Sequence, residues 1–249
     1  VAFPDEKIVN ACVHNLNWTH FRCLLRVTDE NARLWYMSIR MSCPNEVEYK
    51  ILGEITRWII MKDSLFIRGK VPMTKAEIRA VSVAQMELTE DAVVYDIGAG
   101  TGSVSVEIAL SGEKIKVYAI EKNPEGVELI RQNRKKFRVD GIRIIEGNAP
   151  EVLEGLEMPT HVFIGGSSGN LRQIIEKVTA ANPEVKIVLN AISLETLGEV
   201  MELSKDGLLK EIQVTQLSAA RSRILGDYHM MTGQNPVYII RSERRATET

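Results

Sequence analysis

The sequence predicts an α/β fold in which seven strands form a mostly parallel sheet, with helices on both faces and an antiparallel pair at one edge. Three observations lead to this prediction. From Asp91 onward, short apolar runs alternate with helical patterns. Three glycines follow the first apolar run, between a predicted strand and a predicted helix. The last two strand-like runs have no helical pattern between them.

The parallel part of the sheet is predicted from five apolar runs that are connected by helical or turn patterns. The predicted strands are 92–97, 116–121, 142–147, 161–166 and 185–191. The predicted helices are 102–110, 124–137, 171–181 and 193–205. Pro124 suits the first turn of its helix, where the missing N–H costs no hydrogen bond. The remaining runs, 209–220 and 236–242, are predicted to close the sheet as an antiparallel pair.

The composition changes near Met61. All three cysteines and all three tryptophans precede this residue, and the first 60 residues follow no single helical or strand period. We predict an N-terminal extension over residues 1–60, a main domain over 61–241 and a C-terminal tail over 242–249. Three origins of the extension are open: the remnant of a fused upstream domain, a specific extension, or a non-native extension with Met61 as the true start.

The charge is balanced: 31 basic and 33 acidic residues in a chain of 249 give a net charge of -2. This balance offers no electrostatic footprint for nucleic acid or an anionic membrane, so neither is an expected partner. No run of about 18 apolar residues occurs, and the start lacks a signal-peptide pattern. Three cysteines make no disulfide framework. We therefore expect a cytoplasmic protein.

One cluster in the predicted extension is a weak candidate for a zinc site. Cys12, His14, His20 and Cys23 could provide four ligands, but their spacing matches no familiar zinc motif. Ordinary core residues are the favoured interpretation, and we expect no metal.

The three glycines Gly98, Gly100 and Gly102 lie at the carboxyl end of the first predicted strand, where parallel sheets bind their ligands. Glycine permits a tight turn and a close approach of a ligand to the backbone. A dinucleotide pattern would need glycine at position 103, which is Ser103, and no phosphate-binding lysine follows. Asp96 ahead of the glycines favours a ligand with an amine over a pyrophosphate. These features predict S-adenosylmethionine, which carries an ammonium and a sulfonium.

Two later strand ends fit the same ligand. Glu121 ends the second predicted strand and can accept both ribose hydroxyls. Asn148 and Ala149 follow the third strand and can frame an adenine. The structural alternative for the glycines is a tight turn without a ligand, and for Glu121 it is a solvated strand end. The joint occurrence of these residues at successive strand ends favours a cofactor site.

Seven stretches carry a resemblance to a known family: 66–79 (FIRGKVPMTKAEIR), 95–107 (YDIGAGTGSVSVE), 118–130 (YAIEKNPEGVELI), 146–153 (EGNAPEVL), 163–171 (FIGGSSGNL), 189–197 (LNAISLETL) and 220–240 (ARSRILGDYHMMTGQNPVYII). They resemble the class I, Rossmann-like methyltransferases that use S-adenosylmethionine, and more narrowly the decarboxylating precorrin and cobalt-precorrin methyltransferases of cobalamin biosynthesis. The resemblance implies methylation of carbon 15 of a corrin precursor, a tetrapyrrole, and decarboxylation of its acetate at carbon 12. Whether the precursor carries cobalt stays open.

The patterns and the resemblance together define the expected cofactor site. Its residues are Thr74, Asp96, Gly98, Ala99, Gly100, Thr101, Gly102, Glu121, Asn148 and Ala149. Glu121 and Asn148 both stand where aspartate is common in the family. The second departure puts a side-chain contact to adenine in doubt, whereas a backbone contact at Ala149 is unaffected. The first 60 residues lie outside the resemblance.

A corrin precursor is a large polycarboxylate, which arginine and lysine side chains can bind. The candidates are Arg68, Lys75, Arg221 and Arg223, with ordinary surface cations as the alternative. Arg221 and Arg223 are two residues apart on a predicted strand, which puts both side chains on one face. The resemblance also implies a homotetramer, in which these arginines could lie at a subunit interface instead.

No catalytic residue is assigned, because the electron-rich substrate itself supplies the electrons for methyl transfer. His229 could act as an acid or base, but a structural role is favoured. An RNA base methyltransferase of the same fold is one rival, and it predicts a basic face. A non-catalytic protein that binds S-adenosylmethionine is another, and it predicts binding without turnover. Ser103 disfavours a nicotinamide oxidoreductase.

Overall fold

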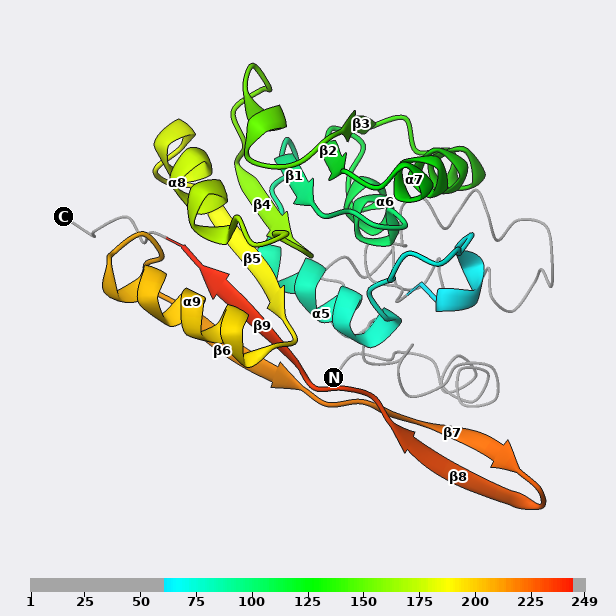
Figure 1. Ribbon diagram of the computed structural model, residues 1–249. Helices are drawn as coiled ribbons and strands as arrows, with labels where there is room; N and C mark the ends of the chain where they lie inside the picture. The colour runs from blue at the N-terminus through cyan, green and yellow to red at the C-terminus, as the bar shows by residue number, and fades with distance from the viewer. Residues whose placement is uncertain (1–60, 244–249) are drawn as a thin grey trace, which may run out of the picture. The chain divides into compact units, whose positions relative to one another are not determined.

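The computed structural model of the chain describes residues 61–243, and Figure 1 shows their arrangement. A seven-stranded sheet has the strand order β3-β2-β1-β4-β5-β9-β6, and a separate two-stranded sheet is formed by β7 and β8. The predicted extension 1–60 and its zinc candidate lie outside the described residues, as does most of the predicted tail. The domain boundary near Met61 therefore stays a prediction.

The first five strands of the sheet are parallel, as the sequence predicts. They are β1 (Val93–Ile97), β2 (Lys116–Glu121), β3 (Ile142–Glu146), β4 (His161–Ile164) and β5 (Lys186–Ala191). β1 lies at the centre, paired with β2 on one side and β4 on the other. The order of the strands reverses at this point, so the carboxyl end of β1 opens into a crevice where ligands of such sheets bind.

The closing antiparallel pair is also confirmed. β9 (Val237–Ser242) pairs antiparallel with β5 on one side and with β6 (Gln213–Leu217) on the other. The predicted strand 209–220 is shorter in the structure, because the chain leaves the sheet after Leu217. It then forms β7 (Ala220–Leu225) and β8 (Tyr228–Gly233), an antiparallel ribbon that projects from the body of the molecule (Figure 1).

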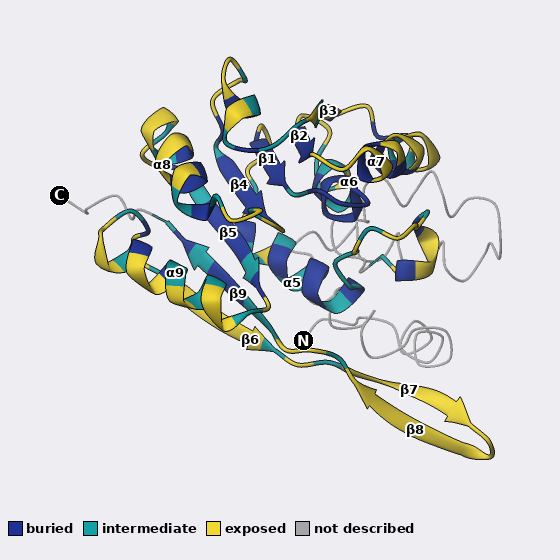
Figure 2. Cartoon of the chain, viewed as in Figure 1, coloured by how far each residue is buried: buried dark blue, intermediate teal, exposed yellow. Residues whose placement is uncertain are grey.

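The helices lie in two layers. α5 (Ala76–Met86), α6 (Ser103–Leu110) and α7 (Pro124–Phe137) pack on one face of the sheet, and α8 (Leu171–Ala181) and α9 (Leu194–Lys205) pack on the other (Figure 1). Two single turns of 3₁₀ helix, η2 (Asp63–Leu65) and η3 (Glu151–Leu153), lie in the connections. The cartoon coloured by burial shows the strands between these layers as the buried centre of the fold (Figure 2).

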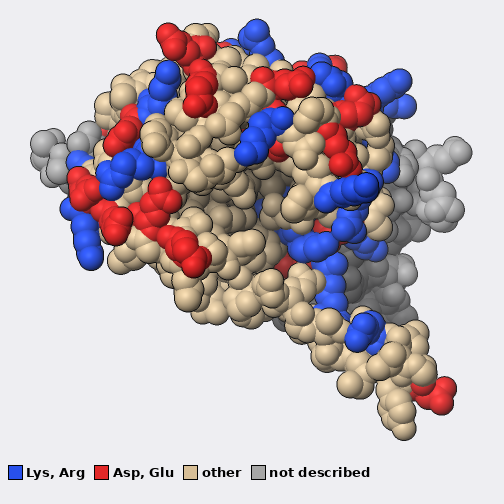
Figure 3. Space-filling view, in the orientation of Figure 1, with Lys and Arg blue, Asp and Glu red and all other residues tan. Residues whose placement is uncertain are grey.

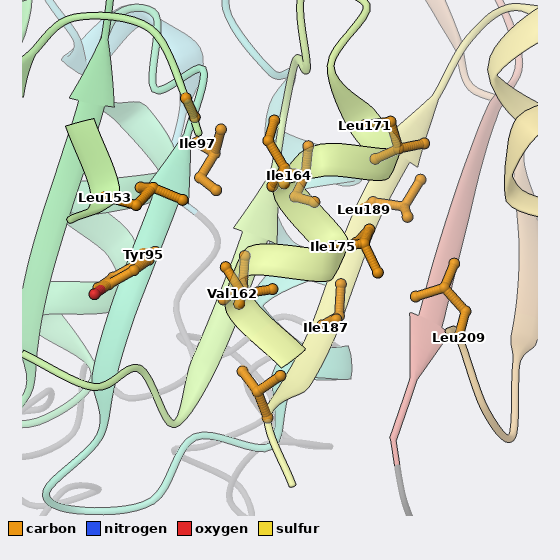
Figure 4. Close-up of a cluster of buried hydrophobic side chains, with 14 of the residues drawn as sticks. Tyr95, Ile97, Leu153, Val162, Ile164, Leu171, Ile175, Ile187, Leu189 and Leu209 are labelled. Carbon is orange, nitrogen blue, oxygen red and sulfur yellow. The ribbon is translucent and has the colours of Figure 1, made fainter. Parts of the chain in front are cut away.

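The period-two alternation of β1 divides the core into two clusters. Val93, Tyr95 and Ile97 pack with α8 and α9, in the cluster shown in Figure 4. Val94 faces the opposite way and packs with the layer of α5 and α6. A residue's parity in this strand therefore decides which helical layer its side chain meets.

One helix, α5, was not predicted. Its buried face includes Arg79 and Ser82, and these polar residues interrupt the apolar periodicity that predicts helices. The Arg79 side chain has no exposed surface and makes several bonds inside the fold. Its guanidinium donates to Glu107 Oε1 at 2.8 Å, to Asp63 Oδ1 at 3.3 Å and to the carbonyl oxygen of Thr74 at 2.6 Å.

Arg79 thus fastens the segment before α5 to the body of the fold. Its guanidinium also donates to the carbonyl oxygen of Met61 and lies 4.7 Å from the ring centre of Phe66. Burial raises the pKa of Glu107, although the charge of Arg79 opposes that rise. The two carboxylates beside Arg79 are therefore stable in the interior because a guanidinium accompanies them.

We expect Arg79→Met to lower the free energy of unfolding by about 3–5 kcal/mol, because it leaves the largely buried carboxylate of Glu107 without a countercharge and removes one of the two guanidinium partners of Asp63. Urea denaturation measures this change. Lys205→Met, on the exposed surface of α9, is the control and should alter stability little. An Arg79→Met variant as stable as the parent would show that the buried network contributes nothing to the fold.

Candidate functional site

A cavity of about 820 Å³ lies at the carboxyl ends of the central strands. Its walls come from the glycine loop after β1, the segment before α5, the loops after β2, β3, β4 and β5, and the base of the β7–β8 ribbon. These segments are far apart in the sequence and meet only because parallel strands present their carboxyl ends at one edge of the sheet. Most of the predicted cofactor residues therefore line one cavity at the strand ends.

The glycine loop is shaped by contacts with other backbone segments. Gly98 has φ +72°, and a Cβ atom added to it would lie 2.6 Å from the carbonyl oxygen of Gly166 in the loop after β4. Gly100 has φ +57°, and an added Cβ would lie 2.9 Å from the carbonyl oxygen of Pro72. Any other residue at these two positions would be strained and would push the walls apart.

Gly102 has a different role from the one predicted. A Cβ atom added there would meet the side chain of Ile130 in α7 at 3.1 Å, so this glycine allows helices α6 and α7 to pack closely. Neither Gly102 nor Thr101 lines the cavity. Thr101 is buried beneath the loop, where its carbonyl oxygen accepts a bond from Asn133 Nδ2 at 2.9 Å.

Glu121 lies in the cavity wall at the end of β2, as predicted. Its Oε2 accepts a hydrogen bond from the backbone N–H of Gly100 at 2.7 Å, and its Oε1 accepts one from Asn123 N–H at 2.8 Å. A carboxylate can accept about four such bonds, so two acceptor positions remain for ligand hydroxyls. Glu121 therefore supports the glycine loop and can still bind a ribose.

Asp96 does not reach the cavity, and this placement differs from the prediction. It has the same parity in β1 as Val94, so its side chain points into the layer of α6, where it accepts a hydrogen bond from Ser105 Oγ. Asp96 has no exposed surface, and its Oδ1 has no hydrogen-bond partner among residues 61–243. Burial raises the pKa of Asp96 to about 7, despite the opposing bonds from Ser105.

The other predicted cofactor residues are brought together. Thr74, Ala99, Asn148 and Ala149 all line the cavity. The carbonyl oxygen of Ala149 accepts a bond from Asn170 Nδ2 at 3.0 Å, which connects the loop after β3 to the start of α8. Asn170 was missed as a site residue, although it belongs to one of the stretches that carry the family resemblance.

A second half of the cavity was not predicted. It is uncharged and combines small, apolar and amide side chains. Its residues are Gly165, Gly166, Ser167, Ser168, Asn190, Ile192, Ala219, Gln234, Asn235 and Val237. Several belong to the stretches after the fourth and fifth strands that carry the family resemblance. Their positions therefore indicated a site, although their residue types alone did not.

The predicted substrate-binding cations divide into two groups. Arg68, Lys75 and Arg221 line a second depression of about 530 Å³, and Lys75 also lines the main cavity. Arg223 and His229 line neither space and lie on the exposed ribbon. Neither Arg221 nor Arg223 lines the main cavity, so their proposed role as a pair that binds the substrate stays a prediction.

The cavity fits S-adenosylmethionine in size and in chemistry. Its volume lies in the range of small-molecule sites, roughly 300–1,000 Å³. Glu121 offers acceptors to a ribose, and the Gly100 backbone leaves space that a side chain would fill. The glycine loop itself carries no lysine or arginine that would bind a phosphate. The glycine loop and Glu121 therefore suit a nucleoside.

Comparison with known proteins agrees with this geometry. The profile of a family described as "precorrin methyltransferase domain" matches residues 65–244. A Pyrobaculum calidifontis protein named probable cobalt-precorrin-6B C(15)-methyltransferase (decarboxylating) is 42% identical over 182 residues, which cover 72% of this chain and 92% of the relative. The Salmonella typhimurium protein named cobalt-precorrin-6B C(15)-methyltransferase (decarboxylating) is 36% identical, and the match covers 74% of this chain and 96% of the relative.

A solved structure gives the same result. The crystal structure of precorrin-6Y C5,15-methyltransferase from Geobacter metallireducens superposes with a TM-score of 0.69 at 38% identity. The superposition covers 74% of this chain and 97% of that one. The described part of the chain also contains no helix that is long and apolar enough to cross a membrane.

Asp96 should make the stability of the protein depend on pH. Its pKa is about 7 in the folded chain against 3.8 for an ordinary aspartate, so the folded chain binds more protons and loses stability as the pH rises from about 4 to 7. We expect Asp96→Asn, which cannot ionise, to gain stability relative to the parent by a margin that grows to a few kcal/mol across this range.

The measurement is urea denaturation of both proteins at several pH values. His161 acts in the opposite sense: desolvation lowers its pKa from 6.5 to about 4, so its contribution to stability is lost as the pH falls through this window. Only the difference between the two proteins isolates Asp96, because His161 is common to both. A difference that does not vary with pH would contradict the prediction.

Proposed function

The chain belongs to the precorrin methyltransferase family, and from this premise we propose that it methylates carbon 15 of a corrin precursor and removes carbon dioxide from the acetate at carbon 12. It is an S-adenosylmethionine-dependent methyltransferase of the class I fold. The observation that carries the proposal is one cavity that combines the glycine loop and Glu121 with uncharged residues from the loops after β4 and β5 and from the base of the ribbon. One half suits a nucleoside and the other suits a neutral organic surface.

The first half would hold S-adenosylmethionine. Glu121 would accept hydrogen bonds from the ribose, Gly98 to Gly100 would give space to the ligand at the loop, and Asn148 and Ala149 would border the adenine. Thr74, from the segment before α5, would cover the ligand. When bound, the cofactor supplies a methyl group activated by its sulfonium. The chain's own part is to hold donor and acceptor in a near-attack geometry.

The second half would hold the reacting edge of the tetrapyrrole. Among the cavity-lining residues of the described chain, only Lys75, Glu121 and Lys122 carry charge, and none of them belongs to this half. The described residues therefore present no ionisable acid or base there, and Asn190, Gln234 and Asn235 can orient groups by hydrogen bonds.

This neutrality suits the loss of carbon dioxide. The bond between the methylene and carboxyl carbons of the acetate breaks, and its electron pair enters the conjugated macrocycle. That pair balances the one that the ring carbon uses to bond the incoming methyl group. The methylene carbon gains a proton to become a methyl group and the methylated macrocycle releases one, so the overall reaction takes up no net proton. A cation beside the departing carboxylate would stabilise it and oppose its departure, and an uncharged wall avoids this.

We also propose that the chain forms a homotetramer, through the β7–β8 ribbon. Every residue of both strands is exposed, including the apolar side chains of Ile224, Tyr228 and Met231, which are 72%, 74% and 65% exposed. A ribbon with such side chains and free edges is a common site of association. Nucleic acid and membranes have no part in this proposal, and we place the reaction in the cytoplasm.

Mass spectrometry of a precorrin-6B or cobalt-precorrin-6B preparation, incubated with the protein and S-adenosylmethionine, tests the function. We expect a gain of one methyl group and a loss of carbon dioxide. Glu121→Gln should weaken cofactor binding by about ten- to a hundredfold, because charge-assisted hydrogen bonds are worth about 1.5–3 kcal/mol. Glu128→Gln, on the exposed surface of α7, is the matched control.

Other outcomes of these experiments would favour one of the rival functions. Binding of the cofactor without turnover of either precursor would identify a non-catalytic binding protein. Methylation of RNA in place of the tetrapyrrole would favour the nucleic-acid rival. Equal cofactor affinity in Glu121→Gln and the parent would remove Glu121 from the site.

The homotetramer is tested by the molecular mass in solution. We expect the double variant Ile224→Ser/Met231→Ser to shift the mass measured by light scattering toward that of the monomer, 27.9 kDa, because it removes exposed apolar surface. Leu65→Ser, which changes an exposed apolar residue outside the ribbon, is the control. A monomeric parent, or an unchanged mass in the double variant, would contradict association through the ribbon.

A further inference from the structure

The second depression, which we call the cation groove, is lined by Lys62, Asp63, Ser64, Arg68, Lys75, Ala76, Glu77 and Arg221. It has a volume of about 530 Å³, and Lys75 belongs to both its wall and that of the main cavity. Four of its residues are basic and two are acidic. In the space-filling view, lysine and arginine side chains gather near the junction between the body and the β7–β8 ribbon (Figure 3).

The two acids of the groove are already neutralised. Arg221 donates from Nη2 to Glu77 Oε2 at 2.6 Å and from Nε to Glu77 Oε1 at 3.1 Å. Its Nη1 donates to Asp63 Oδ2 at 3.1 Å. The hydrogen bond from Arg221 lowers the pKa of Glu77, and Arg79 pairs with the other oxygen of Asp63. Arg221 is thus committed to the protein's own carboxylates and forms a wall of the groove.

The three remaining cations have no side-chain partner in the described part of the chain. Within residues 61–243, the side chains of Lys62, Arg68 and Lys75 have no ion-pair or hydrogen-bond partner. Lys62 and Arg68 are exposed, and Lys75 is half-buried at the boundary with the main cavity. Three unpaired cations around one concave surface create a local positive potential in a chain whose overall charge is slightly negative.

We propose that the cation groove is the subsite for those carboxylate arms of the substrate that are not lost, and that Lys62, Arg68 and Lys75 bind them. This inference rests on the proposed function, in which the substrate is a large polycarboxylate. The uncharged half of the main cavity cannot neutralise its acid groups. The groove begins where the cavity ends, at Lys75, so a single large ligand can occupy both.

Under this proposal, the retained carboxylates of the substrate and the carboxylate that is lost would meet different surroundings. Retained carboxylates gain affinity from cations, whereas the carboxylate that departs as carbon dioxide would be held back by one. Lys62 and Arg68 line the groove only, whereas Asn190, Gln234 and Asn235 line the main cavity only. Lys62 was not among the predicted substrate residues, and the groove adds it to Arg68 and Lys75.

Fluorescence titration of the full chain with uroporphyrin, an octacarboxylate tetrapyrrole, tests the groove without turnover. We expect Lys62→Ala/Arg68→Ala to bind uroporphyrin about tenfold more weakly than the parent, since exposed ion pairs contribute up to about 1 kcal/mol each. The difference should shrink at high salt. Affinity for S-adenosylmethionine should not change, because neither residue lines the main cavity.

Lys205→Ala, which removes an exposed lysine of α9, is the matched control and should bind uroporphyrin like the parent. Arg68→Lys should retain most of the affinity, which separates loss of charge from loss of fold. Absence of uroporphyrin binding by the parent, or equal binding by the parent and the double variant, would overturn the subsite.

Turnover distinguishes this proposal from the function on which it rests. With the corrin precursor, the double variant should raise KM by about tenfold and leave kcat and the ratio of carbon dioxide to methyl transferred unchanged. If the parent converts no precursor but binds uroporphyrin through Lys62 and Arg68, the proposed reaction fails and the groove remains a carboxylate site. If the parent is active and KM is unchanged in the variant, the groove is not a subsite.

Discussion

The site depends on the close approach of three backbone segments, which only residues without a Cβ atom allow. Gly98 lies against Gly166 after β4, and Gly100 lies against the carbonyl of Pro72 before α5. Glu121 adds a hydrogen bond to Gly100 N–H, and Arg79 holds the third segment through the carbonyl of Thr74. The glycine loop, the loop after β4 and the segment before α5 are therefore in direct contact with one another.

Much of the fold could be predicted because its parallel strands are buried on both faces and read as continuous apolar runs. The exceptions have physical causes. α5 buries Arg79 and Ser82, so its inward face does not look apolar. The β7–β8 ribbon exposes both faces, so neither the alternation of a half-buried strand nor a fully apolar run marks it. Its first strand was consequently merged with β6.

The sequence predicted the site residues whose position follows from the backbone at the strand ends. It predicted less well those whose role depends on the direction of the side chain. The glycines and Glu121 follow from strand ends and loop geometry. Asp96 belongs to the same motif, yet its parity sends it into the α6 layer, and the sequence does not reveal which face of β1 meets the ligand. Arg221 forms ion pairs with Glu77 and Asp63, which lie 144 and 158 residues away in the sequence, and no local pattern predicts such pairs.

Within the described residues, the β7–β8 ribbon is held at its root, and its tip is exposed. Its root includes Ala219 and Gln234, which are joined by a 2.8 Å backbone hydrogen bond and line the uncharged half of the cavity. Arg221, one residue inside β7, braces that root against Glu77 in α5 and Asp63 in η2. A load applied at the tip, near Gly226, is therefore carried to the rim of the cavity.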